Sequence, residues 1–285
     1  MKCYGVQPNI KWEQKSANYE QVRALLHRSR PQPGSLVVLP EMFATGFSMH
    51  ARVIAEGRRS PTTEFLRTLA RQHRVCVVGG MVRARGPGAY VNEAVAVGPT
   101  GRLRGHYDKI QLFGPGREPE HYQPGNELAL FRWGRFQVAL FICYDLRFPE
   151  LFRLAARRGA DVMVVIANWP SRRAGHWKVL LQARAIENQA FVVGVNRCGE
   201  DPQHRYAGGS LLLDPRGNVL AEAGTVEGLI EARLNRRALV RWRREFPALR
   251  DIRTRMRLGQ PGGGRAEDGG RGSGRNQRRL TSLNP

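Results

Sequence analysis

The chain alternates between two kinds of hydrophobic pattern. Short, continuous apolar runs, typical of strands buried on both faces, occupy residues 36–39, 75–78, 137–142, 162–166 and 190–195. Between them, apolar residues recur at helical spacing in residues 16–26, 62–69, 149–155 and 177–187. Thr62 is expected to cap the second of these helices, and Pro149 suits the first turn of the third. Strands that alternate with helices in this way predict an α/β layered fold.

Two other stretches predict antiparallel strand pairs. Residues 92–97 and 103–107 flank a turn at 99–101, and residues 209–213 and 219–221 flank a turn at 214–217. A further strand is expected near residues 229–233. From residue 258 onward the chain is mostly Gly, Arg, Ser, Asn and Pro, with almost no apolar residue for a core. We therefore expect one large domain over residues 1–257 and a disordered basic tail over residues 258–285.

The composition is that of a chain that can bury its own core. Of the 285 residues, 41% are hydrophobic, so stability requires neither disulfides nor a metal. The four cysteines have no CxxC spacing and no neighbouring His pair, so neither a zinc site nor a disulfide framework is indicated. The sequence shows no secretory signal, and no run approaches the roughly 18 apolar residues of a membrane span. We expect a cytoplasmic protein with reduced thiols.

The charge is strongly basic and is carried mostly by arginine. The chain has 46 basic and 24 acidic side chains, for a formal net charge of +22. On charge alone, a basic nucleic-acid-binding protein is a candidate from a different functional class. However, residues 1–257 contain no zinc-finger spacing, aromatic RNA-binding motif or recognisable recognition helix, so specific nucleic-acid binding is not expected.

Three polar side chains stand at the ends of predicted strands, where α/β folds place their sites. Cys143 lies between the strand 137–142 and the helix that starts at Pro149, which resembles the turn that exposes a nucleophile. Glu41 follows the strand 36–39 and can take a thiol proton, while Lys109 offers a compact ammonium to an oxyanion. Taken singly, such residues are more often an inert core cysteine, a helix cap or salt-bridge partner, and a solvated surface charge.

Taken together, the three resemble the nitrilase superfamily. Residues 39–43 (LPEMF), 107–113 (YDKIQLF) and 143–151 (CYDLRFPEL) match its glutamate, lysine and cysteine motifs in order. The stretches 118–125, 167–170 and 183–189 also agree, so the resemblance covers residues 1–257. It implies an α-β-β-α sandwich, assembly as a homodimer or higher homo-oligomer, and no metal or organic cofactor.

The resemblance also implies a role for each site residue. Cys143 would attack an amide carbon, Glu41 would act as the general base, and Lys109 with the backbone N–H of Tyr144 would hold the oxyanion. A thioester would then be hydrolysed by water. Glu118 matches a second glutamate that orients the lysine or assists proton transfer, although Glu120, two residues on, competes for that place.

Within the superfamily, residues 41–49 and 167–170 are most similar to the bacterial omega-amidase branch. This similarity implies a small anionic amide, 2-oxoglutaramate or 2-oxosuccinamate, as the substrate. Arg147 is the candidate partner for the substrate carboxylate, with Arg172 or Arg173 as alternatives, because a guanidinium pairs with a carboxylate through two hydrogen bonds. The alternative is that Arg147 pairs with Asp145 or Glu150 and fixes the start of the helix.

Further predictions concern the pocket walls and the alternative substrates. Tyr144, Phe47 and Trp169 are expected to wall the pocket, although aromatic residues beside strand ends more often pack than bind. The rival amides within the superfamily are an N-carbamoyl compound, a deaminated peptide and a simple aliphatic amide. Pocket shape decides between such close chemistries.

Overall fold

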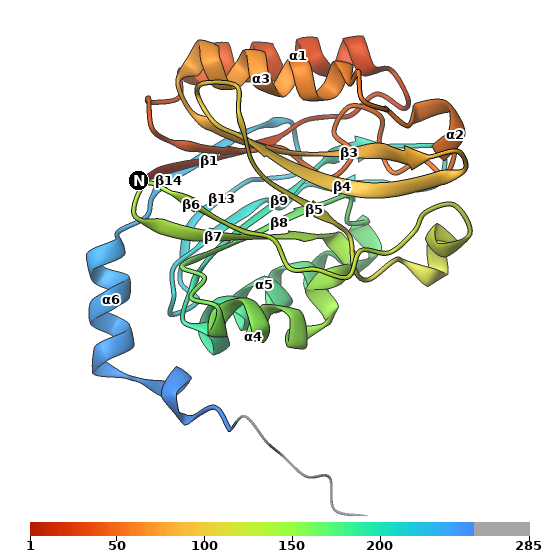
Figure 1. Cartoon of the computed structure of the whole chain (residues 1–285). Helices are drawn as coiled ribbons and strands as arrows, with labels where there is room; N and C mark the ends of the chain where they lie inside the picture. Colours follow the sequence, from red (N-terminus) through yellow and green to blue (C-terminus); the bar gives the residue numbers. More distant parts are fainter. Residues whose placement is uncertain (254–285) are drawn as a thin grey trace, which may run out of the picture. The chain divides into compact units, whose positions relative to one another are not determined.

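Two six-stranded mixed sheets pack face to face in the computed structural model, which describes residues 1–253 (Figure 1). They belong to the compact unit Met1–Asp251. The first sheet has the order β14 (Gly228–Arg233), β1 (Lys2–Gln7), β2 (Leu36–Val38), β3 (Cys76–Gly86), β4 (Ala89–Val97), β5 (Leu103–Asp108). The second has the order β13 (Val219–Glu222), β12 (Leu211–Leu213), β9 (Phe191–Asn196), β8 (Val162–Ala167), β7 (Phe136–Ile142), β6 (Leu130–Trp133).

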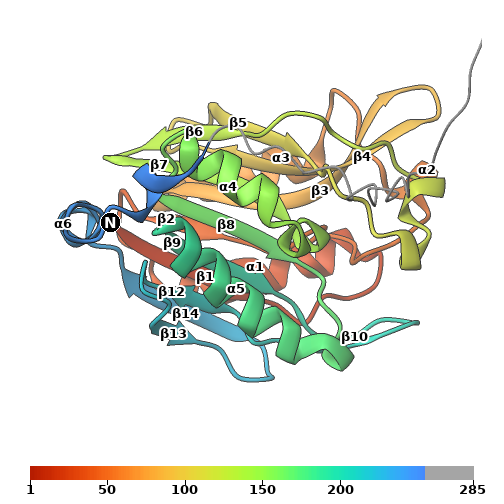
Figure 2. The same cartoon turned by 90° about the horizontal axis from the view of Figure 1, so that it is seen from below.

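Helices cover the outer face of each sheet. Helices α1 (Lys15–Ser29) and α3 (Pro61–His73) pack on the first sheet, and α4 (Pro149–Arg157) and α5 (Ala174–Asn188) pack on the second. Figure 1 shows the resulting four layers, and Figure 2 shows α4 and α5 lying across the second sheet. The predicted α-β-β-α sandwich is therefore confirmed. Shorter elements complete the unit: α2 (Ala51–Ile54), α6 (Arg236–Glu245), and a separate hairpin of β10 (Cys198–Glu200) and β11 (Arg205–Ala207).

The central strands are apolar at every position because both of their faces are buried. In β8, Val162, Val164 and Ile166 face the other sheet, whereas Met163 and Val165 face the helices. The expected strand pairs are confirmed, since β4 pairs with β5 and β12 with β13, both antiparallel.

The cap predicted for α3 was wrong. Ser60, not Thr62, is the N-cap, because its hydroxyl accepts the N–H of Thr63 at 3.0 Å and Pro61 occupies the first helical position. Thr62 instead lies in the first turn, where its hydroxyl donates to Glu56 at 2.6 Å.

Two further predictions concern the C-terminal tail and membrane-spanning segments. The boundary predicted at residue 257 and the tail over 258–285 lie outside the described residues. Within residues 1–253, no helix is long and apolar enough to cross a bilayer.

Candidate active site

The structure brings Glu41, Lys109, Cys143 and Glu118 together where the two sheets meet. Glu41 follows β2 and Lys109 follows β5, both in the first sheet, whereas Cys143 follows β7 in the second. Glu118 begins a short 3-10 helix, Glu118–Glu120, after the segment that leaves β5. β2 runs parallel to β1 in the first sheet, β7 runs parallel to β8 in the second, and both β2 and β7 end at this edge. Side chains from the two sheets therefore converge on one point.

Lys109 is fully buried between two carboxylates. Its Nζ lies 3.0 Å from Glu41 Oε1 and 2.8 Å from Glu118 Oε2, and all three side chains are buried from solvent. Burial alone would lower the pKa of Lys109, but the charges of Glu118 and Glu41 outweigh it and raise that pKa. The lysine is therefore a fixed cation.

The position of Lys109 separates Glu118 from Glu120. Glu118 is buried and also accepts the backbone N–H of Phe113 at 2.6 Å. Glu120 is exposed and pairs with Arg117, with 2.6 Å between the guanidinium and the carboxylate. Of the two glutamates that the sequence left open, the structure places only Glu118 beside the lysine.

Two asparagines that the sequence analysis did not single out hold Glu41. Asn92 Nδ2 donates to Glu41 Oε1 at 2.7 Å and to Glu118 Oε1 at 2.9 Å. The backbone N–H of Asn168 donates to Glu41 Oε2 at 2.8 Å, and its side chain donates to the Glu41 carbonyl at 2.7 Å. Gly80 faces this turn, and a Cβ there would lie 2.6 Å from Glu41 Cα. The glutamate is thus fixed at both its backbone and its carboxylate.

Cys143 has the backbone expected of an exposed nucleophile turn. Its φ is 47°, a left-handed conformation that is uncommon for a residue other than glycine. The thiol is half-buried and donates to the carbonyl oxygen of Asn168, 3.8 Å away. Burial and then the charge of Glu41 raise the pKa of this thiol well above its usual value, against the opposing effect of Lys109. The resting sulfur is therefore protonated and requires a base before it can attack.

A buried carboxylate ties the cysteine turn to the lysine strand. Asp145 accepts the Tyr107 hydroxyl at 2.8 Å, the N–H of Ile142 at 2.8 Å and the N–H of Gln111 at 2.8 Å. Burial raises the pKa of Asp145 to about 6, against the lowering effect of these hydrogen bonds. Asp145 therefore fixes Cys143 relative to Lys109 without touching either side chain.

A small pocket opens over Cys143 and contains two guanidiniums. It is lined by aromatic rings, two arginines and the histidine of the β10–β11 loop: Phe47, Phe113, Tyr144, Trp169, Arg147, Arg173, His204. Tyr144, Phe47 and Trp169 thus lie where the sequence predicted pocket walls. His204 was missed, because nothing in its local sequence places that loop beside Cys143.

Arg147 and Arg173 reach the pocket without a carboxylate partner. Arg147 lies over the Trp169 ring at 4.9 Å, and its Nη2 is 3.3 Å from His176 Nδ1. Arg173 lies over the Phe113 ring at 5.2 Å. Within residues 1–253, neither guanidinium lies within 4.0 Å of an acidic side chain, so the alternative pairing of Arg147 was wrong.

The electrostatics of these two arginines favour a bound anion. Partial burial, followed by the charges of Arg172 and Arg147, lowers the pKa of Arg173. Two like charges held close together in a partly dry pocket repel each other, and a carboxylate between them would relieve that repulsion. Arg172 is exposed and does not line the pocket.

Comparisons with known proteins agree with this geometry. The family model described as carbon-nitrogen hydrolase matches residues 5–244. The omega-amidase YafV of Yersinia enterocolitica is 38% identical, covering 88% of this chain and 96% of the relative. The 2-oxoglutaramate amidase of Bacillus subtilis is 33% identical, covering 87% and 96%.

A solved structure gives the same assignment. The crystal structure of XC1258 from Xanthomonas campestris, a CN-hydrolase superfamily protein with an arsenic adduct in the active site, superposes with a TM-score of 0.83. It is 35% identical, covering 90% of this chain and 99% of its own. The chain belongs to the carbon-nitrogen hydrolase family, the nitrilase superfamily, and is a hydrolase of the amidase type.

Proposed function

We propose that the protein is a thiol amidase that converts a small anionic amide, 2-oxoglutaramate or 2-oxosuccinamate, into the dicarboxylate and ammonia. The observation that carries the proposal is the buried cluster of Glu41, Lys109 and Glu118 beside the Cys143 thiol. A protonated thiol, a held carboxylate and a fixed cation are the three groups that acyl transfer through sulfur requires.

Acylation begins with the protonated thiol. As the Cys143 sulfur attacks the amide carbon, its proton passes to Glu41, and the carbonyl becomes a tetrahedral oxyanion. Lys109 and the backbone N–H of Tyr144 stabilise that negative charge. The C–N bond then breaks, the nitrogen takes the proton from Glu41, and ammonia leaves behind a thioester.

Deacylation repeats these roles with water as the nucleophile. Glu41 accepts a proton from water as the water oxygen attacks the thioester carbon, and the same two donors hold the second oxyanion. The C–S bond breaks, the carboxylic acid is released, and the sulfur recovers its proton from Glu41. Glu118 keeps the Lys109 ammonium in place, 2.8 Å from its Oε2.

The anionic substrate is supported by the two pocket arginines. An amide whose carbonyl carbon lies at Cys143 extends its other end toward Arg147 and Arg173, which carry two charges and no carboxylate partner within residues 1–253. Bidentate pairing with a guanidinium favours a carboxylate over an uncharged group. The names of the similar proteins, omega-amidase and 2-oxoglutaramate amidase, point to the same substrates.

The test is ammonia release by the purified protein from 2-oxoglutaramate and 2-oxosuccinamate, compared with glutamine, an N-carbamoyl amine and a simple aliphatic amide. The Cys143→Ala variant is the control, because it retains the fold and lacks the nucleophile. A preference for the two oxo-amides that disappears in the variant supports the proposal. Preference for another amide overturns the substrate, and turnover by Cys143→Ala overturns the mechanism.

The assembly and the compartment are parts of the same proposal. We expect a homodimer or higher homo-oligomer in the cytoplasm, where the four free cysteines stay reduced. Light scattering of the purified chain tests the oligomeric state, since a mass of 32.1 kDa marks a single copy. Fractionation of cells tests the cytoplasmic location.

A further inference from the structure

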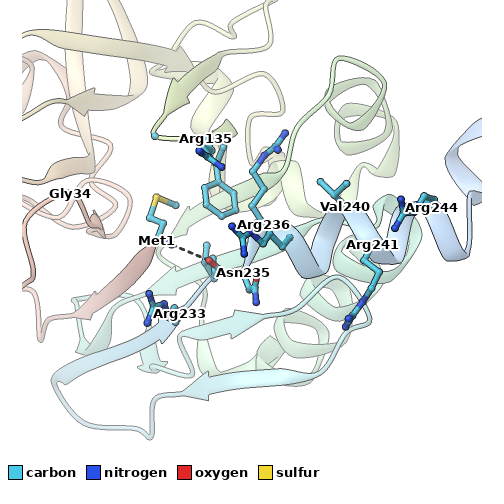
Figure 3. Close-up of a pocket in the computed structure, with 13 residues that line it drawn as sticks. Met1, Gly34, Arg135, Arg233, Asn235, Arg236, Val240, Arg241 and Arg244 are labelled. Carbon is cyan, nitrogen blue, oxygen red and sulfur yellow. Dashed lines mark hydrogen bonds between the residues drawn. The ribbon is translucent and has the colours of Figure 1, made fainter.

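An arginine-lined groove lies at the opposite end of the sandwich from Cys143. It has a volume of about 1120 Å³ and is bounded by Met1, the turn between β6 and β7, the end of β14 and one face of α6 (Figure 3). Six arginines line it: Arg135, Arg233, Arg236, Arg237, Arg241, Arg244. Phe136 in its floor starts β7, and Cys143 follows the other end of that strand, which spans about 20 Å. The groove is therefore separate from the amidase pocket.

Most of this positive charge is uncompensated. Arg236 pairs with Asp161 at 3.3 Å, and Arg241 lies 3.6 Å from Glu245. Within residues 1–253, the remaining four arginines have no acidic side chain within 4.0 Å. The N-terminal amine of Met1 also lies in the groove and donates to the Leu234 carbonyl at 3.0 Å. Burial and then the charge of Arg233 lower its pKa, so the arginines supply most of the positive charge. A groove of this kind attracts anions.

The arginines form a row as well as a cluster. Arg237, Arg241 and Arg244 stand at positions i, i+4 and i+7 of α6, so they share one face of the helix over about 10 Å. Arg135 and Arg233 are exposed on the neighbouring turn and strand end, as Figure 3 shows. A row of guanidiniums matches an extended anion with charges at regular intervals better than it matches a single compact ion.

We propose that this groove binds the sugar–phosphate backbone of a nucleic acid, without sequence preference. A guanidinium fork pairs with a phosphate through two hydrogen bonds, and arginine is the only charged side chain that lines the groove. Phe136, the one aromatic residue among those that line the groove, is buried and offers no stacking platform. Bases are therefore not read, which is consistent with the absence of a sequence-specific binding motif.

The charge of this face and of the sequence after α6 favours the same partner. Because six arginines line this face, the same face of a second copy would be repelled from it. The sequence after α6 continues basic: residues 258–285 contain five arginines and two acidic residues. Both features raise the local concentration of a polyanion.

The test is fluorescence anisotropy of the full chain with a labelled oligothymidylate or oligouridylate of about 20 nucleotides, at several salt concentrations. If the four unpaired arginines each meet a phosphate, log K falls with log salt with a slope of about −3. Between 50 and 200 mM salt, that slope weakens binding by roughly 50-fold. A slope near zero would overturn the proposal.

Two matched variants locate the binding. The groove variant removes three charges from the groove: Arg135→Gln/Arg237→Gln/Arg244→Gln. The α2 variant removes three exposed charges around α2, which lies at the right in Figures 1 and 2, opposite α6: Arg52→Gln/Arg58→Gln/Arg59→Gln. We expect the groove variant to lose at least 10-fold in affinity and about 2 units of salt slope, and the α2 variant to lose less than 3-fold. Equal losses in both variants would mean that binding is diffuse and would overturn the groove assignment.

Competition separates a strand from other anions. Inorganic tripolyphosphate and polyglutamate serve as competitors at equal total charge. Weak displacement by both supports an extended phosphodiester partner. Complete displacement by tripolyphosphate would instead identify a small-polyphosphate site, and complete displacement by polyglutamate an acidic-protein site, and either result overturns the proposal.

Discussion

Replacing Glu118 by glutamine tests how the Lys109 ammonium is held. The Glu118 carboxylate accepts Lys109 Nζ at 2.8 and 3.1 Å, Asn92 Nδ2 at 2.9 Å and the Phe113 N–H at 2.6 Å. Every neighbour is a donor, and a glutamine has a single acceptor oxygen. Whichever way its amide turns, its NH₂ group faces a donor and leaves at least one buried donor unpaired, at a cost of about 1–3 kcal/mol.

The same change also removes one charge from a buried ion pair. Breaking such a pair costs about 3–5 kcal/mol, and the lower end applies here because Glu41 still faces the lysine 3.0 Å away. A Lys109 that is no longer fixed stabilises the oxyanion less well, and the loss of one such donor lowers kcat by about 10²–10³-fold. We therefore expect Glu118→Gln to lower kcat about 10²-fold and the free energy of unfolding by about 3 kcal/mol, with little change in KM.

Ammonia release at saturating substrate measures the first quantity, and urea unfolding measures the second. The matched control is Glu120→Gln, because Glu120 is exposed, two residues away, and pairs only with Arg117. It should behave as the unmodified protein in both assays. Wild-type kcat in Glu118→Gln would refute the reasoning, and so would an equal loss in Glu120→Gln.

The remaining predictions concern the residues around this cluster. Asn92→Leu should lower kcat more than 10-fold because it removes the shared donor of Glu41 and Glu118, and steady-state kinetics with unchanged KM would show this. Lys109→Arg should abolish turnover in a folded protein, since a broad fork does not fit where a compact ammonium lies, as kinetics beside circular dichroism would show. Arg173→Gln should raise KM for an anionic amide about 10-fold or more and leave an uncharged amide unaffected, and equal changes for both substrates would contradict it. Folding raises the pKa of Asp145 from 3.8 to about 6, so the folded state binds its proton more tightly than the unfolded state. The resulting contribution to the free energy of unfolding, about 3 kcal/mol, is full below about pH 4 and is lost as pH rises through 6. Urea unfolding of Asp145→Asn from pH 4 to 8 should lack that decline.

Strand ends, together with the resemblance of the three motifs to one family, made the main site residues predictable. A buried parallel strand is recognisable as a continuous apolar run, so the first polar residue after it stands out, as Glu41 and Cys143 do. Asn92 carries no such signal, because a polar residue inside a strand normally faces solvent. Only the pairing of β4 between β3 and β5 turns it toward Glu41. Local sequence therefore reveals the residues at strand ends, whereas the residues that hold them depend on the tertiary structure.

The choice between neighbouring residues shows the same limit. Glu118 and Glu120 are chemically identical and flank one proline, and Ser60 and Thr62 similarly flank Pro61. For the glutamates the outcome depends on burial, because Glu118 faces the interior and Glu120 faces solvent. Ser60 and Thr62 are both buried, and the position of Pro61 in the first turn makes Ser60 the cap. Sequence spacing in a short irregular segment determines neither outcome.

The distribution of the two basic residue types has a physical reason at the site. The chain uses arginine nearly everywhere, yet the fully buried cation of the candidate site is a lysine, with Nζ within 3.0 Å of both Glu41 and Glu118. A compact ammonium with three donors can contact two carboxylates and still direct a proton at a developing oxyanion, whereas a planar guanidinium spreads its donors over a wider fork. Arginine is retained at the pocket mouth, at Arg147 and Arg173, where a fork suits a carboxylate. We therefore expect the exchange of one basic residue for the other to be tolerated over the surface of this protein and to fail at Lys109.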